Sequence, residues 1–103
     1  MPSILERLSS WYAQKCNGDW EHSYGVRINT LDNPGWGVKI DLVETSLLDV
    51  PFSAIEIDLD HEVHWLRCWK EGSTFHVACG PGRLEDGLEI FLLWAESHGS
   101  GAG

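Results

Sequence analysis

Two segments of alternating apolar and polar residues, joined by Leu-Asp-Asn-Pro-Gly, constrain the fold of this chain more than any other feature. Residues 24–28 and 36–42 both alternate with a period of two, as half-buried β-strands do. Between them, Pro34 fixes its φ, Gly35 tolerates a positive φ, and the preceding Asp and Asn can bond their own backbone. The pattern therefore predicts a β-hairpin with a loop longer than two residues.

A helix is predicted at each end of the chain. Residues 3–15 place apolar side chains at 3.6-residue spacing, and Ser3 with Glu6 has the spacing of a capping box. Residues 84–97, which follow a Gly-Pro-Gly break, carry a second amphipathic stripe. These two segments are expected to pack on the strands.

Three further strands are predicted at residues 55–59, 63–70 and 74–79, with Leu59 facing inward and residues 43–53 as an irregular crossover. The links between strands are short and contain no helical crossover, which suits antiparallel neighbours. The fold class is therefore α+β: a single antiparallel sheet of about five strands, flanked by an N-terminal and a C-terminal helix that cover one face. Because the fourth strand is apolar on both sides, a central place is predicted for it.

The length of 103 residues suits one domain, predicted over residues 1–98, with residues 99–103 as a disordered Gly- and Ser-rich tail. No stretch approaches the roughly 20 apolar residues that span a bilayer. The N-terminus lacks a basic region followed by an apolar run, so no signal peptide is predicted. A cytoplasmic location is the expectation.

The charge of the chain narrows the class of partner. Sixteen acidic residues against seven basic ones give a formal net charge of -9, which argues against binding to nucleic acid or to anionic membranes. Six tryptophans are many for this length, and tryptophan is enriched both in cores and at binding hot spots. The acidic residues either serve only to keep the protein soluble or complement the charge of a basic protein partner.

A small metal- or thiol-dependent enzyme is the alternative to a protein-binding domain, because potential ligands gather between residues 58 and 79. They are Asp58, Asp60, His61, His64, His76 and Cys79. No recognised ligand spacing is present, and strand residues three apart point to opposite faces. The three cysteines form no C-x-x-C pair, so reduced and mostly buried thiols are expected. No metal, cofactor or catalytic residue is therefore predicted.

Two weaker chemical patterns lie elsewhere. The Gly-Pro-Gly break and Arg83 could form a backbone nest for an anion. In an extended segment, Asp19 and Glu21 would face one way and Trp20 and His22 the other, which gives an acid/base cluster little support. Neither pattern comes with a substrate pocket signature.

Recognition of another protein is the fourth possibility. Residues 17–36 set the aromatic side chains of Trp20, Tyr24 and Trp36 among acids, donors and acceptors, as an interface with large anchors and a charged rim would. Tyr24 and Trp36 could equally begin strands and point into the core.

Several short motifs in the chain also resemble those of a known protein family. Residues 11–42 contain W-Y with a nearby Cys, G-D-W-E-H, Y-G, T-L-D-N-P-G-W and I-D-L, followed by L-x-D-x-P-F at 47–52 and E-I-F-L-x-W at 89–94. This series closely resembles immunity protein family 53 of bacterial polymorphic toxin systems. The resemblance extends over about residues 4–97, with no fixed pattern at 60–76.

The resemblance implies a small cytosolic protein that binds and blocks a cognate toxin without catalysis of its own. The toxin is expected to be basic, with a nuclease as one candidate, since negative charge complements a basic groove and speeds encounter. The predicted contact group is Asp19, Trp20, Glu21, His22, Asp32, Asn33 and Trp36. If these shared motifs instead mark the framework, the contacts are expected on the acidic third strand and the hairpin of residues 60–76.

Overall fold

The structure is a computed structural model that describes residues 2–98, so the tail predicted at residues 99–103 lies outside the described residues. In chain order the elements are α1 (Ile4–Lys15), α2 (Trp20–Ser23), β1 (Val26–Leu31), β2 (Gly35–Asp41), β3 (Ile55–Ile57), β4 (Leu66–Glu71), β5 (Thr74–Cys79) and α3 (Leu84–His98). In the described part of the chain, no helix is long and apolar enough to cross a membrane.

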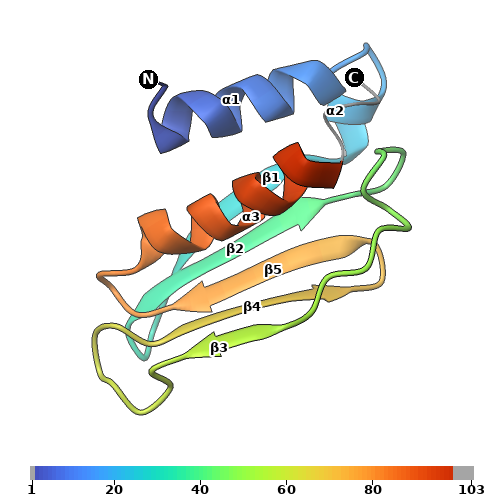
Figure 1. Cartoon of the computed structure of the whole chain (residues 1–103). Coiled ribbons are helices and arrows are strands. Elements are labelled where there is room, and N and C mark those ends of the chain that lie inside the picture. Colours follow the sequence, from blue (N-terminus) through green and yellow to red (C-terminus); the bar gives the residue numbers. More distant parts are fainter. Residues whose placement is uncertain (1, 99–103) are drawn as a thin grey trace.

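The strands form one antiparallel sheet in the order β1-β2-β5-β4-β3, with both long helices on the same face (Figure 1). The predicted α+β class, the five-stranded sheet and the one-sided helical layer are therefore confirmed. The prediction of a central fourth strand is wrong, because β2 pairs with β5 and places β5 in the middle. β4 lies between β5 and the edge strand β3.

The core lies between the sheet and α3. The inward side chains of β5, which are Phe75, Val77 and Cys79, are buried, and α3 supplies Phe91 and Leu92 from above. α1 packs mainly against α3 rather than against the sheet. The opposite face of the sheet carries no helix, and we call it the outer face (Figure 1).

The first helix begins as its sequence predicts. The Ser3 hydroxyl accepts a hydrogen bond from the Glu6 backbone N–H, and the Glu6 carboxylate accepts one from the Ser3 N–H. Arg7 then joins α1 to α3, with its guanidinium 2.7 Å from Glu89 and 2.8 Å from Glu96.

The chain departs from the prediction where it enters the first hairpin. Residues 20–23 form the short helix α2 instead of an extended segment, so β1 begins at Val26 rather than at residue 24. The side chain of Asn17 causes this turn, since its Oδ1 accepts hydrogen bonds from the Asp19 and Trp20 backbone N–H groups at 2.9 Å. Such local side-chain bonds compete with strand formation.

Two predicted strands are shorter in the structure. β3 covers only residues 55–57, because Asp58 adopts a left-handed φ of 51° and turns the chain away from the sheet. The prediction that Leu59 faces inward is therefore wrong: it is 50% exposed. β4 starts at Leu66 rather than at residue 63.

The predicted β1–β2 hairpin is confirmed, with residues 32–34 as its turn. Gly35 is required here by a close approach, because a Cβ at this position would lie 2.2 Å from the Cys79 carbonyl oxygen of β5.

Candidate functional site

Two loops meet at one end of the sheet. β1 and β3 run in the same direction, so the β1–β2 turn and the β3–β4 loop both project from the end at which these strands finish (Figure 1). Together they border an open depression of about 520 Å³. Its lining residues are Asn33, Pro34, Leu59, Asp60, His61, Glu62 and Trp65. We call residues 32–34 and 58–65 the acidic end.

Carboxylates and apolar side chains are interspersed on the acidic end. Asp32, Asp60 and Glu62 are exposed, and none of them forms an ion pair with another residue in the range 2–98. Leu59 and Val63 are 50% and 41% exposed beside them. Solvated negative charges and exposed apolar side chains therefore lie next to each other on this surface.

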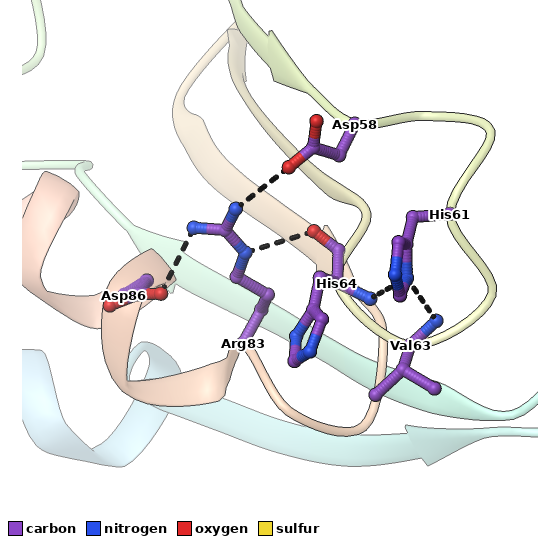
Figure 2. Close-up of polar contacts among 6 residues, drawn as sticks. All are labelled: Asp58, His61, Val63, His64, Arg83 and Asp86. Carbon is purple, nitrogen blue, oxygen red and sulfur yellow. Dashed lines mark hydrogen bonds and ion pairs between the residues drawn. The ribbon is translucent and has the colours of Figure 1, made fainter.

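Arg83 holds the β3–β4 loop in place (Figure 2). It precedes α3, and its side chain is only 21% exposed. Its Nε donates to the His64 carbonyl oxygen at 2.9 Å, and its two terminal nitrogens donate to the carboxylates of Asp58 at 3.1 Å and Asp86 at 3.0 Å. One cation therefore fixes the loop to the helical layer and neutralises part of its charge.

His61 organises the loop from within. Its Nδ1 accepts hydrogen bonds from the backbone N–H groups of Val63 at 3.1 Å and His64 at 3.0 Å (Figure 2). The Nδ1 atom therefore carries no proton in this arrangement. With its polar backbone groups bonded in this way, the loop presents the neighbouring carboxylates of residues 60 and 62 on a defined framework.

The acidic end continues onto the outer face through a row of side chains on and before β4. Trp65, Arg67 and Trp69 alternate with the buried Leu66 and Cys68, so they project from the outer face. The Arg67 guanidinium lies 4.8 Å from the centre of the Trp69 ring. Arginine and tryptophan in one half-exposed row are typical of interface hot spots.

The ring of Trp69 also stacks against His76 of β5. Burial is the main cause that lowers the pKa of His76; Lys39 lowers it further, while Glu71 acts in the opposite direction. A groove of about 440 Å³ runs beside this stack, over the small directly paired residues Gly37 and Ala78. We call Trp65, Arg67, Trp69 and His76 the aromatic row.

The structure divides the predicted contact group between opposite ends of the first hairpin. Asp19, Glu21 and His22 lie in or next to α2, before β1, whereas Asp32, Asn33 and Trp36 lie after it. The intervening strand spans roughly 20 Å at about 3.3 Å per residue. These two sets therefore form separate surfaces.

Trp20 is a framework residue, so its expected role as a surface anchor is wrong. It is 2% exposed, its Nε1 donates to the Val43 carbonyl oxygen at 2.8 Å, and its ring packs edge-on against Trp11. Tyr24 is half-buried against the same core. The aromatic density of residues 17–24 therefore closes the core beneath α1.

The remaining residues near α2 have mixed roles. The carboxylate of Glu21 accepts hydrogen bonds from the Asn17 and Gly18 backbone N–H groups, and its pKa is lowered first by its own backbone N–H and then by these two groups. Asp19 and His22 are exposed. Glu21 thus stabilises the turn, and its two neighbours face solvent.

At the other end, Asp32 and Asn33 are exposed on the β1–β2 turn. Trp36 is half-buried against the core, and its Nε1 donates to the Pro81 carbonyl oxygen at 3.3 Å. The turn therefore belongs to the acidic end, while Trp36 packs against the core next to it and has mainly a structural role.

The residues of the enzyme hypothesis do not converge. Among residues 2–98, no group of three His, Cys, Asp or Glu side chains could hold a metal ion. Cys79 faces the helices and is fully buried, whereas His76 faces outward from the same strand. Burial raises the pKa of Cys68 to about 12 and also raises the pKa of Cys79, so neither thiol is activated as a nucleophile.

The donors of the possible anion nest are already engaged. The Gly80 N–H donates to the Trp65 carbonyl oxygen at 2.8 Å, and the Gly82 N–H donates to that of Val63 at 3.4 Å. Arg83 bonds within the protein, as described above. This segment therefore fixes the β3–β4 loop rather than an anion.

The sequence did not identify Leu59 as a site residue, and it indicated Val63, Trp65, Arg67 and Trp69 only as part of the alternative contact region at residues 60–76. The alternation of Trp65, Arg67 and Trp69 with inward residues is visible in the sequence, but which of the two sides lacks a covering layer depends on where both helices pack.

In a comparison with protein families, residues 5–96 match the model of immunity protein 53. Neither the curated proteins nor the solved structures contain a match to this chain. Because the matched region covers most of the described sheet and both long helices, the chain belongs to the immunity protein 53 family.

Proposed function

We propose that this protein binds a cognate toxin of a polymorphic toxin system in the cytoplasm and neutralises it without catalysis of its own. Membership of the immunity protein 53 family is the observation that carries this proposal.

We further propose that the toxin is a basic protein, with nucleases as the candidate class, and that it contacts the acidic end and the adjoining aromatic row. Asp32, Asp60 and Glu62 supply unpaired negative charge that accelerates encounter with a cationic surface. Trp65 and Trp69 supply large side chains that slow dissociation. This surface combines the Asp32 and Asn33 contacts expected from the shared motif with the alternative location at residues 60–76.

The decisive experiment expresses the toxin domain encoded beside this gene, with and without this chain, in the same cells. Survival only when the chain is present, together with a stable complex of the purified proteins, supports the proposal. Unchanged killing despite soluble expression of both proteins contradicts it. A form of the toxin inactivated in its active site serves as the control for toxicity of expression itself.

A further inference from the structure

The two edges of the sheet differ in their protection against pairing with another strand. β3 is three residues long and ends where Asp58 turns away with a left-handed φ. β1 is six residues long, contains neither proline nor lysine, and pairs with β2 over all six positions without a bulge. Proteins usually block exposed edges with such residues or with bulges, so β1 is an unprotected edge.

The free hydrogen-bonding groups of this edge can be assigned. The Gly25 carbonyl oxygen accepts a hydrogen bond from the Asp41 N–H at 3.0 Å, so Gly25 faces β2. Backbone groups alternate in direction along an antiparallel strand. Val26, Ile28 and Thr30 therefore direct their N–H and C=O groups away from β2, and no other strand among residues 2–98 pairs with them.

An apolar surface accompanies the free edge. Val26 and Ile28 face the helical side of the sheet, but α1 packs against α3 and leaves a groove of about 430 Å³ between itself and β1. Ile28 is 37% exposed and Tyr12, on the wall of the groove, is 38% exposed. Leu5, seven residues before Tyr12 on the same side of α1, is 65% exposed.

We propose that a second copy of this chain pairs with β1 in antiparallel fashion, about a two-fold axis at Ile28, and joins two sheets into one. In this register Ile28 lies opposite its own copy, Val26 opposite Thr30, and Arg27 opposite Asn29. The three outward residues of each copy form about six hydrogen bonds across the axis. The pairing is self-complementary and places no like charges opposite each other.

Although the chain carries a net negative charge, the charges close to β1 do not oppose this pairing. The only charged residue of β1 is Arg27, which is 3.4 Å from Asp41 of its own chain. Charges farther than about 8 Å are largely screened at physiological ionic strength. The acidic end begins at Asp32, directly after β1, but the paired backbone groups belong to Val26, Ile28 and Thr30. This inference therefore does not depend on the proposed function.

The oligomeric state of the full chain tests the proposal. Sedimentation equilibrium over a range of protein concentrations is expected to show a monomer–dimer equilibrium. Ile28→Lys places two ammonium groups opposite each other and is expected to weaken the dimer by about tenfold or more. Leu93→Lys makes the same change at a side chain on α3 that is 55% exposed, and it should leave the dimer intact.

A charge-swap experiment separates pairing from general destabilisation. Ile28→Lys and Ile28→Glu should each be monomeric yet folded, and their mixture should form a heterodimer because opposite charges then meet at the axis. A wild-type protein that stays monomeric at every concentration would overturn the proposal. So would a mixture that fails to associate, or a β1 edge that is protected from hydrogen exchange only when the toxin is bound.

Discussion

The indole ring of Trp69 lies parallel to the imidazole of His76, with ring centres 4.9 Å apart and planes inclined by 7°. This contact crosses from β4 to β5 on the outer face and is the centre of the aromatic row. It also gives the stability of the fold a defined dependence on pH.

The stability contribution of His76 should be lost on acidification. Its pKa is lowered in the folded protein, mainly by burial, so the unfolded chain, with a pKa near 6.5, binds the proton first as the pH falls. The contribution is complete above pH of about 6.5 and decreases below it. Urea unfolding of wild type and His76→Gln between about pH 5 and 8 measures this. A difference between the two proteins that does not change with pH would contradict the assignment.

Replacing Arg83 should loosen the β3–β4 loop. Arg83→Met removes the donors to the His64 carbonyl oxygen, Asp58 and Asp86, and we expect a loss of about 1–3 kcal/mol in the free energy of unfolding. Amide hydrogen exchange at residues 61–64 should accelerate. Arg27→Met is the matched control, because the Arg27 side chain is 55% exposed and its loss should cost less than about 1 kcal/mol.

Gly87→Ala should destabilise the protein although alanine favours helices. The added Cβ would lie 2.5 Å from Cγ1 of Val77, so either the buried Val77 side chain or α3 itself would have to shift. Helix propensity alone would stabilise by about 1 kcal/mol, whereas overpacking costs about 1–3 kcal/mol. Thermal and urea unfolding decide the sign. Ser97→Ala, at an exposed position of the same helix, is the control and should change stability by less than about 0.5 kcal/mol.

Neutralising the acidic end should slow association with the toxin. We expect Asp32→Asn, Asp60→Asn and Glu62→Gln together to reduce the association rate constant by about tenfold at low salt, with a smaller effect on dissociation. The difference should disappear near 1 M salt, where the screening length is about 3 Å.

The control for that experiment neutralises three exposed acids elsewhere on the protein. Asp19→Asn, Glu44→Gln and Asp49→Asn change the net charge by the same amount but leave the acidic end intact. Stopped-flow measurements that show equal rates for the two triple variants would mean that net charge alone, and not this surface, steers the encounter.

Only one cysteine should react in the native state. Cys16 is half-buried, whereas Cys68 and Cys79 are fully buried and have raised pKa values. Mild alkylation followed by mass spectrometry should give a single adduct at Cys16, and three adducts after unfolding. Modification of Cys79 in the native protein at a similar rate would revive a thiol-dependent role.

Much of the fold follows from local patterns in the sequence. The capping box of Ser3 and Glu6, the alternation in β5 and the Asn-Pro-Gly turn each specify their element through nearby backbone and side-chain chemistry. The helix α2 was missed because its cause is a pair of bonds to one asparagine oxygen, which period-two alternation does not reveal.

The candidate site was only partly predictable for a different reason. Asp32 and Asn33 were expected from the shared motif at residues 30–36. Their neighbours at residues 58–65 are brought to them by the strand order, which a linear pattern leaves open. Trp20 has the composition of an anchor, and only its packing under α1 shows that it is internal.

Because Trp20 is buried, part of the motif that assigns this chain to its family lies in the core and cannot contact a partner. Under the proposed function, the W-E-H motif belongs to the structural framework. Specificity for a given toxin then depends on a few loop residues beside the Asn-Pro-Gly turn. Two members of the family with the same framework motifs would then fail to protect against each other's toxin. Exchanging residues 58–65 between them would be the shortest route to transferring protection.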